Sequence, residues 1–327
     1  MKERILKNKI LVIGGAGYIG SHVQKQLLKE GFDVVVYDNL STGDEVNILE
    51  GTNFIKGDIL DYTHLKDVMS DNIDGVIHLA AKKAVGESMQ KPEIYALNNI
   101  AGSINILNAM VECGVRNIVF SSSAAVYGMP SYTPIDEKHS INPINYYGYT
   151  KRCIEENMDW YAKLGKINFA SLRYFNAVGY ACDKSIRGKE RNPQNLLPII
   201  MEVATGKRET LSVFGNDYDT RDGTCIRDYI HVSDLANAHT KAMNKLINEN
   251  ISFILNLGTG IGTSVKEVVE ATQKVIGKPI NCVYADRRPG DPALLTSDAK
   301  KAKELLDWEP QYTNIEDIIQ TVWNLEI

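Results

Sequence analysis

The sequence has few cysteines, no excess of positive charge and no long uninterrupted apolar run. Its formal net charge of −5 at pH 7 offers no broad basic surface, so nucleic acid is not an expected partner. This net charge is compatible with a local basic pocket for a small anion. No run approaches the ~20 apolar residues that span a bilayer, so no membrane partner is expected. What remains is an ordinary globular composition in 327 residues, enough for one large α/β domain or two smaller ones.

The five cysteines form no pattern that indicates metal binding or disulfides. They are odd in number, widely spaced and free of Cys-x-x-Cys pairs. We interpret them as packing residues, expect no metal site, and infer a reducing compartment, the cytoplasm.

Short apolar runs alternate with helical patterns through the first half of the chain. The runs cover residues 10–13, 34–37, 53–55, 76–81, 117–121 and 169–174, and the helical patterns lie near 19–29, 65–69, 94–113 and 151–164. This alternation predicts a parallel sheet covered by helices, and the continuous apolar character of the runs indicates strands that are buried on both faces.

After residue 176 the pattern loosens into a helix at 196–205, a returning strand at 251–258, and helices at 265–276 and 299–306. The predicted fold class is α/β: a doubly wound parallel (Rossmann) sheet with a smaller C-terminal substrate-binding lobe. We assign residues 1–175, with a returning segment near 225–258, to the sheet domain and mainly residues 176–327 to the lobe.

A glycine-rich loop follows the first predicted strand. Its spacing, Gly14-x-x-Gly17-x-x-Gly20, lies between that strand and a helix, where close backbone approach and free helical N–H groups suit a pyrophosphate. These glycines also argue against a signal peptide, despite the basic residues that precede them.

Asp38 ends the next strand, where a carboxylate accepts hydrogen bonds from a ribose 2′-hydroxyl and repels a 2′-phosphate. The sequence therefore favours NAD over NADP.

The spacing Tyr-x-x-x-Lys occurs three times, at Tyr62, Tyr147 and Tyr180. A lysine one helical turn away lowers the pKa of a tyrosine, whose usual value is about 10, and so prepares it to act as a base. Only Tyr147 begins a predicted helix after the strand that ends in the serines 121–123. Because ligands of a doubly wound sheet lie beyond the carboxyl ends of its strands, Tyr147 with Lys151 is the candidate base.

Nearly the whole chain resembles the UDP-glucose 4-epimerase family of extended short-chain dehydrogenases/reductases. The most specific matching segments are residues 83–88 (Lys-Ala-Val-Gly-Glu-Ser) and 214–218 (Phe-Gly-Asn-Asp-Tyr). The other matching segments are residues 14–20, 78–81, 120–128, 147–151, 173–176, 227–232 and 287–291. The resemblance implies NAD as cofactor, a UDP-hexose as substrate, a homodimer formed by helices near 94–113 and 151–164, and a role in galactose metabolism.

The resemblance also implies the site residues. The implied catalytic residues are Tyr147, Ser123 and Lys151. The cofactor would contact Gly14, Gly17, Tyr18, Ile19, Gly20, Asp38, Asn39, Asp58, Ile59, Ala80, Ala81, Lys83, Asn98, Ser121, Tyr147, Lys151, Tyr174 and Phe175. The UDP-sugar would contact Ser123, Tyr147, Asn176, Asn195, Leu196, Ser212, Phe214, Arg227, Arg288, Asp291 and Leu295. Forked guanidinium donors suit a diphosphate, and Phe214 suits packing on a uracil ring.

The implied reaction interconverts UDP-glucose and UDP-galactose by oxidation at C4, rotation of the 4-keto sugar and re-reduction. Three rival functions stay open at this point: a 4,6-dehydratase, a UDP-glucuronate epimerase or decarboxylase, and a cofactor sensor without chemistry. Ala124 and Ala125 offer no acid for a dehydratase, and Ala125 replaces a hydroxyl residue of many relatives. Leu295 stands where some relatives carry a tyrosine, so we expect more room for an N-acetylated UDP-hexosamine.

Overall fold

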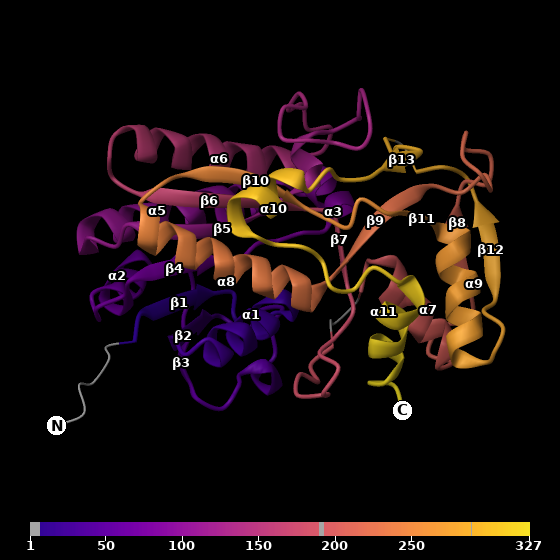
Figure 1. The fold of residues 1–327 in the computed structure, drawn as a ribbon, viewed down its shortest axis with the longest axis horizontal. Coiled ribbons are helices and arrows are strands. Elements are labelled where there is room, and N and C mark those ends of the chain that lie inside the picture. The colour runs from indigo at the N-terminus through magenta and orange to yellow at the C-terminus, as the bar shows by residue number, and fades with distance from the viewer. Residues whose placement is uncertain (1–6, 190–192, 289) are drawn as a thin grey trace.

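A seven-stranded parallel sheet forms the larger half of the protein. The computed structural model describes residues 7–189, 193–288 and 290–327, so residues 1–6 of the predicted first domain lie outside it. The strand order is β10-β6-β5-β4-β1-β2-β3 (Figure 1). The strands are β1 (Lys9–Ile13), β2 (Asp33–Asp38), β3 (Thr52–Lys56), β4 (Gly75–His78), β5 (Asn117–Ser123), β6 (Asn168–Tyr174) and β10 (Phe253–Leu257).

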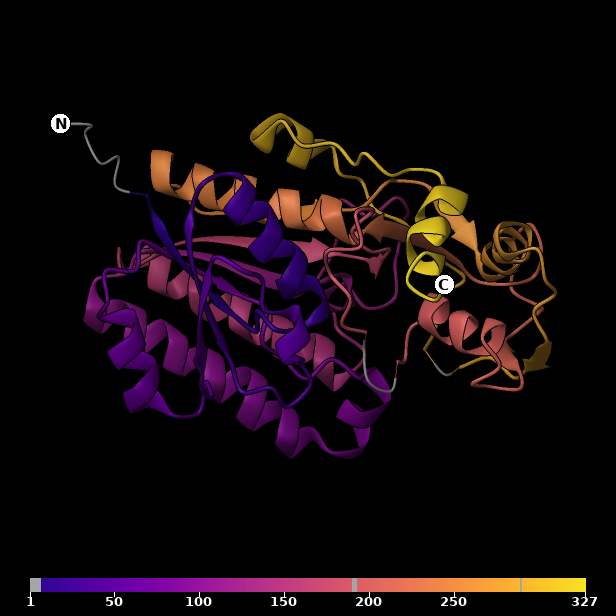
Figure 2. The same ribbon diagram turned by 90° about the horizontal axis from the view of Figure 1, so that it is seen from below.

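Helices cover both faces of this sheet because its strands are apolar on both sides. Ile10 and Val12 of β1 point into one core, together with side chains of α1 and α8, while Leu11 and Ile13 point into the other, with side chains of α2, α5 and α6. Figure 2 shows the two helical layers on opposite sides of the sheet. The helices are α1 (Tyr18–Lys29), α2 (Tyr62–Met69), α3 (Val85–Gln90), α4 (Pro92–Tyr95), a π-helical turn (Ala96–Ala101), α5 (Gly102–Cys113), α6 (Tyr146–Lys163) and α8 (Val232–Glu249).

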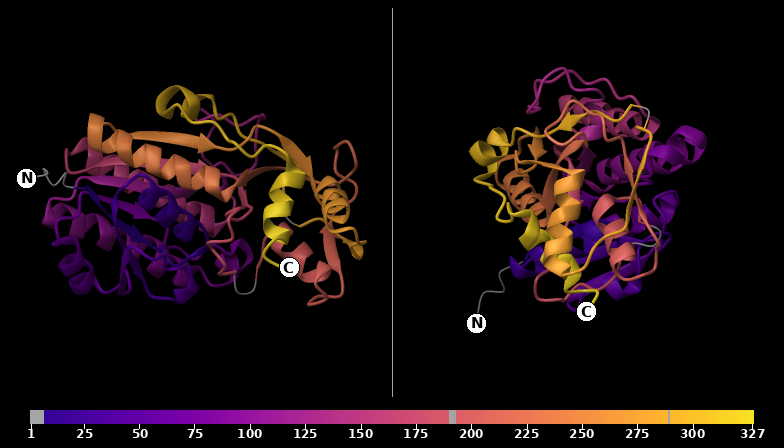
Figure 3. Two further views of the ribbon diagram at one scale, coloured as in Figure 1. Left: turned by 60° about the horizontal axis from the view of Figure 1, so that its bottom comes forward. Right: turned by 90° about the vertical axis from the view of Figure 1, so that its right-hand side faces the viewer.

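A smaller lobe lies at one end of the sheet, on the right both in Figure 1 and in the left-hand view of Figure 3. Its strands are β7 (Asn176–Val178), β9 (Ile226–His231), β11 (Gly262–Ser264) and β13 (Leu294–Leu295) in one sheet, and β8 (Leu211–Phe214) with β12 (Cys282–Ala285) in another. Besides α8, the helices that follow β7 are α7 (Leu196–Ala204), α9 (Val265–Ile276), α10 (Lys300–Leu306) and α11 (Ile315–Trp323). Of these, α10 packs on β10 of the large sheet.

The predicted α/β fold class is confirmed, and each predicted strand of the first half is present. The sequence did not reveal α8, although this helix has 18 residues and packs against α1. The buried stripe of α8 includes Leu235, Ala238, Ala242 and Leu246, a helical spacing that the sequence reasoning overlooked. No helix within the described residues is both long and apolar enough to cross a membrane.

Candidate active site

The glycine loop lies between the end of β1 and the start of α1, at the carboxyl edge of the sheet. Gly14 has a φ of +83°, and a Cβ there would lie 2.5 Å from the backbone nitrogen of Ala80. A Cβ on Gly20 would lie 2.3 Å from the carbonyl oxygen of Gly14. Gly17 caps α1 without a side-chain hydrogen bond, so no side chain occupies the N–H groups of the first turn. The loop therefore offers the close backbone approach and free donors that a dinucleotide pyrophosphate requires.

Asp38, at the end of β2, ties this loop to the sheet. Its carboxylate accepts hydrogen bonds from the backbone nitrogens of Ala16 (3.0 Å) and Leu40 (2.8 Å). Burial raises its pKa, and the two backbone donors oppose that rise. Next to it, Asn39 donates a 2.8 Å hydrogen bond to Asp58. The ends of β2 and β3 thus place three of the predicted cofactor residues, Asp38, Asn39 and Asp58, close together.

The π-helical turn at Ala96–Ala101 holds the segment that follows β4. Asn98 is half-buried in this turn, whereas its neighbour Asn99 is fully buried. The side chain of Asn99 accepts from the backbone nitrogen of Lys82 (2.8 Å) and donates to the carbonyl of the same residue (2.9 Å). Asn99 was not predicted, and no local pattern distinguishes it from Asn98. It fixes the backbone between Ala81 and Lys83, two predicted cofactor residues.

Tyr147 lies in the first turn of α6, which begins after the cap Asn145 and presses against the turn that follows β5. Its hydroxyl shares a hydrogen bond with Ser123, the last residue of β5. Lys151, one turn later, donates a 2.7 Å hydrogen bond to the carbonyl of Ser121, and its Nζ lies 5.8 Å from the centre of the Tyr147 ring. The structure therefore brings together the three predicted catalytic residues. The other two Tyr-x-x-x-Lys matches lie elsewhere, at the start of α2 and in an irregular segment.

Burial dominates the electrostatics of this group of residues. Burial raises the pKa of Tyr147 to about 12, and the hydrogen bond with Ser123 opposes the rise. Burial also lowers the pKa of Lys151 to about 7, with the nearby Glu155 carboxylate opposing this fall. For the protein chain by itself, burial thus dominates the pKa of Tyr147, and the expectation that Lys151 lowers this pKa when the cofactor is bound stays a prediction.

The charged residues predicted to hold UDP contact one another in the lobe. Arg227, on β9, forms an ion pair with Asp291. The guanidinium of Arg288 lies 3.9 Å from the centre of the Phe214 ring and covers one of its faces. Asn176, on β7, donates a 3.1 Å hydrogen bond to the carbonyl of Asp228. A nucleotide that uses these groups must therefore replace contacts that the protein makes with itself.

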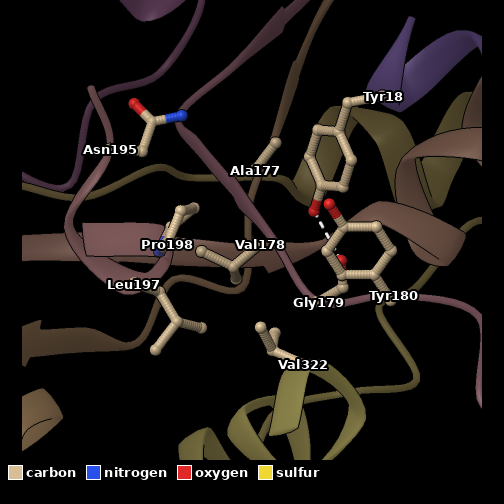
Figure 4. A pocket seen from close by; sticks show the side chains of 9 residues that line it. All are labelled: Tyr18, Ala177, Val178, Gly179, Tyr180, Asn195, Leu197, Pro198 and Val322. Atoms are coloured by element: carbon tan, nitrogen blue, oxygen red, sulfur yellow. Dashed lines mark hydrogen bonds between the residues drawn. The ribbon is translucent and has the colours of Figure 1, made fainter. Parts of the chain in front are cut away.

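A pocket joins the start of α1 to the lobe (Figure 4). Tyr18 of α1 donates a 2.5 Å hydrogen bond to the carbonyl of Gly179, and both residues line the pocket. Asn195, which precedes α7, lines it from the lobe and makes no side-chain capping bond. The pocket therefore lies where a predicted cofactor residue and a predicted substrate residue meet.

Other predicted residues are more dispersed. Leu295 pairs with Arg227 in the β13–β9 register and packs in the small apolar cluster that contains Ala124 and Phe175, so it lies beside the catalytic group. Ser212 is exposed on β8, with Leu211 and Val213 on the buried face. Ile59 packs under α5, and Tyr174 lies beside Ser121. Ile19 is part of α1, and Leu196 is part of α7.

Residues 10–258 match the model of the NAD dependent epimerase/dehydratase family. The chain belongs to this family. A UDP-glucose 4-epimerase of Rhizobium meliloti is 45% identical over 97% of this chain and 96% of that protein. The solved structure of the UDP-glucose 4-epimerase from Bifidobacterium longum in complex with NAD+ and UDP has a TM-score of 0.92 and 38% identity, covering 98% of each chain. The UDP-Glc/GlcNAc 4-epimerase of Campylobacter jejuni has a TM-score of 0.86 and 40% identity, covering 98% of this chain and 99% of that one.

Two further parts of this family member were missed by the sequence reasoning. Glu155 and Arg173 form a buried ion pair beneath the catalytic residues. Asp228, fully buried on β9, accepts hydrogen bonds from Thr259, Gly260 and Ser297 and so joins three segments. The sequence signal for the ion pair was the position of Glu155, one helical turn beyond Lys151. The role of Asp228 had no such signal, because its hydrogen-bond donors are far away in the sequence.

Among the described residues, no group of three His, Cys, Asp or Glu side chains is placed to hold a metal ion.

Proposed function

We propose that the protein interconverts UDP-glucose and UDP-galactose with NAD as a retained cofactor. The observation that carries this proposal is the meeting of Tyr147, Ser123 and Lys151 at the strand end beside the glycine loop. Relatives over almost the full length of the chain are UDP-glucose 4-epimerases, which selects this reaction among those that the fold supports.

In this reaction the chain binds the sugar, orients it and moves one proton. Tyr147 takes the proton of the 4-hydroxyl and later returns it, and Ser123 hydrogen-bonds the same oxygen. NAD held in the glycine-loop cradle would supply the hydride chemistry at C4, and its positive ring would favour the phenolate of Tyr147. Because burial alone raises the pKa of Tyr147 to about 12, we infer that the tyrosine becomes a base only in the holoprotein.

The decisive test is Tyr147→Phe. Loss of the hydroxyl removes the proton carrier, so turnover of UDP-galactose should fall roughly 10²- to 10⁴-fold while the amount of bound NAD is unchanged. Tyr149→Phe is the matched control, because Tyr149 is exposed on the same helix and should keep full turnover. Near-normal turnover of Tyr147→Phe would contradict the assignment.

The rival reactions predict other products. A 4,6-dehydratase needs an acid beside the catalytic serine, and the structure places Ala124 and Ala125 there. Product analysis after incubation with UDP-galactose distinguishes epimerisation from elimination, and an ultraviolet-monitored assay with UDP-glucuronate tests the acid substrate. A sensor protein would leave every one of these substrates unchanged.

We also propose that the sugar pocket admits N-acetylated UDP-hexosamines. Leu295 is half-buried beside Ala124, and a leucine fills less of the pocket than a tyrosine. The Campylobacter jejuni relative is a UDP-Glc/GlcNAc 4-epimerase, which supports the proposal. Rates on UDP-galactose and UDP-N-acetylgalactosamine should be comparable, and Leu295→Tyr should lower the second rate selectively. Absence of hexosamine turnover in the natural protein contradicts it.

We propose, further, a homodimer formed through α5 and α6. These helices lie side by side, with Tyr161 of α6 hydrogen-bonded to Asn108 of α5. Large apolar side chains are exposed on and beside them, including Leu97, Tyr149 and Trp160. Light scattering of Trp160→Glu should show a monomer, whereas Val283→Glu, at an exposed position of the lobe, should stay dimeric. A monomeric natural protein contradicts the proposal.

The five cysteines are all free in the structure, which supports a reducing compartment. We therefore propose a cytoplasmic location. Recovery of the activity in the membrane or secreted fraction of the source cells contradicts it.

A further inference from the structure

The segment that leaves β7, residues 179–189, runs along one face of the cofactor helix α1, and we call it the strap. Three side chains of α1, spaced by one helical turn and therefore on one face, bond to it in succession. Tyr18 donates a 2.5 Å hydrogen bond to the first carbonyl of the strap, as Figure 4 shows. Nε2 of His22 accepts from the backbone nitrogen of Ala181 at 3.1 Å, and Lys25 forms an ion pair with a strap carboxylate at 2.5 Å.

The far end of the strap reaches the glycine loop through one buried side chain. Asn47 ends a 3₁₀ turn (Glu45–Asn47) and is 3% exposed. Its Oδ1 accepts from the backbone nitrogen of Gly188 at 3.0 Å, and its Nδ2 donates to the carbonyl of Ala16 at 3.0 Å. Ala16 belongs to the glycine loop, so one amide joins this loop to a segment 141 residues away from Asn47 in the sequence. We call this contact the clamp.

The clamp needs both an amide and a glycine. A Cβ on Gly188 would lie 2.2 Å from Oδ1 of Asn47, so no other side chain fits at this point of the strap. Gly188 is buried, and its N–H group therefore requires an acceptor within the protein. An aspartate in place of Asn47 would accept from the strap without donating to the loop, and a leucine of the same size would do neither.

A second buried amide holds the glycine loop beside the clamp. Gln24 of α1 is fully buried, and its Nε2 donates to the carbonyl of Gly15 at 2.8 Å and to that of Asn47 at 3.0 Å. The backbone nitrogen of Ala16 donates to Asp38. The loop therefore cannot change shape without breaking buried hydrogen bonds, and the free N–H groups of the first turn of α1 follow it directly in the chain.

This network acts on the cofactor through the shape of the empty loop. Breaking one side of a buried hydrogen bond leaves its partner unsatisfied, so a loop without the clamp relaxes to other conformations. NAD must then reorder the loop when it binds, which weakens binding. Differences in affinity between variants of one site appear mainly in the rate of dissociation. Loss of the clamp should therefore shorten the time for which NAD stays bound.

We propose that Asn47 is a positioning residue for the cofactor: by joining Ala16 of the glycine loop to Gly188 of the strap, it keeps the loop in its binding conformation and slows the release of NAD. The proposal rests on the proposed function for the retention of NAD between turnovers, but not for the sugar that is epimerised.

The test compares two clamp variants with a matched control. Asn47→Leu keeps the size of the side chain and removes both hydrogen bonds. Gly188→Ala presses its Cβ against Asn47 and breaks the same contact from the strap. Asn256→Leu is the control, because Asn256 is fully buried on β10, at the edge of the sheet, and its amide also has two partners. It accepts from Tyr127 at 2.6 Å and donates to the carbonyl of Ile135 at 2.9 Å.

The first readout is the release of NAD and needs no sugar. Each protein is loaded with NAD and mixed with an excess of isotope-labelled NAD, and mass spectrometry of the bound nucleotide gives the dissociation rate. Asn47→Leu and Gly188→Ala should release NAD roughly 10- to 100-fold faster than the natural protein. Asn256→Leu should release it at the natural rate, although thermal unfolding of the NAD-free proteins shows a comparable loss of stability.

Two results of this readout overturn the proposal. One is a natural release rate in the clamp variants, and the other is equal acceleration in Asn256→Leu, because the effect is then a general loosening of the fold. If Asn47→Leu does not fold, Gly188→Ala decides alone.

The second readout is the turnover of UDP-galactose with NAD added to saturation. Both kcat and KM of the clamp variants should return to their natural values, because Asn47 bonds to the loop and the strap, whereas the catalytic residues lie at the end of β5 and the start of α6. A kcat that stays low at saturating NAD contradicts the positioning role. Faster release of NAD from a protein that epimerises no sugar supports the clamp and contradicts the proposed function instead.

Discussion

The two halves of the site are built in opposite ways. In the sheet half, the predicted cofactor residues are fixed by backbone contacts: Asp38 accepts from two backbone nitrogens, and Gly20 is packed on the loop that it closes. In the lobe, the charged residues satisfy one another, as Arg227 does with Asp291. The sheet half is therefore preorganised for its ligand, whereas the lobe must exchange internal partners when a nucleotide binds.

This difference bears on which ligand stays and which one leaves. A preorganised cradle loses little conformational freedom on binding, which favours a retained cofactor. If the predicted substrate residues hold a diphosphate, its binding breaks the Arg227–Asp291 ion pair and uncovers the face of Phe214 on which Arg288 lies. Part of the interaction energy is offset by these losses, which suits a substrate that must be released at each turnover.

The largest expected effect comes from closing the cofactor cradle. In Gly20→Ala the new Cβ would lie 2.3 Å from the carbonyl oxygen of Gly14, and backbone cannot move aside cheaply. The purified variant should contain little or no NAD, measured by nucleotide release and absorbance. Gly86→Ala is the control, because nothing lies within 4 Å of its added Cβ. A stoichiometric amount of NAD in Gly20→Ala would show that the loop is not preorganised by packing.

A smaller effect is expected from the lobe. Arg227→Met removes a charged donor, worth about 1.5–3 kcal/mol, and should raise KM for UDP-galactose roughly 10- to 100-fold while NAD stays bound. Arg287→Met is the matched control for Arg227→Met. Arg287 also pairs with an aspartate, Asp217, but this arginine is exposed. The control should change KM little. Loss of NAD from Arg227→Met would contradict the division between the two halves.

The same division explains how far the sequence could lead. The parallel sheet, the glycine loop and the choice of Tyr147 follow from short-range patterns and from one topological rule, that ligands lie beyond the carboxyl ends of the strands. In the lobe, Arg227 and Asp291 are separated by 64 residues, and no sequence pattern predicts their contact. The roles inferred there came from family resemblance.

Two features of the site that the sequence did not reveal have definite physical causes. The raised pKa of Tyr147 depends on burial by segments that are distant in sequence, which the spacing to Lys151 does not report. The stacking of Arg288 on Phe214 was also missed, because each residue was assigned to the ligand separately. The site was thus predictable as a set of residues, and much less so as a set of charges.

The smallest expected effect lies in a link between the halves. Lys25 of α1 pairs with Asp183 in the segment after β7 at 2.5 Å, and this pairing, with Ser185, lowers the pKa of Asp183 to about 2. Since the folded value lies below the usual ~3.9, the link stabilises the fold above about pH 4 and loses its contribution as the pH falls towards 2. The Asp183 side chain is 59% exposed, so solvent screening limits the contribution to about 0.5 kcal/mol.

Asp183→Asn should therefore lower the unfolding temperature slightly at pH 7, and the difference from the natural protein should shrink progressively below pH 4. Glu156→Gln breaks the exposed pair with Arg152 inside α6 and provides a control that does not cross between the halves. Scanning calorimetry with and without NAD separates the two variants, because the Asp183 pair involves the cofactor helix α1, whereas the Arg152–Glu156 pair lies within α6. A difference that stays constant from pH 7 to pH 3 would mean that the charge of Asp183 contributes nothing, and that the halves are joined by their other contacts, such as the Tyr18–Gly179 hydrogen bond.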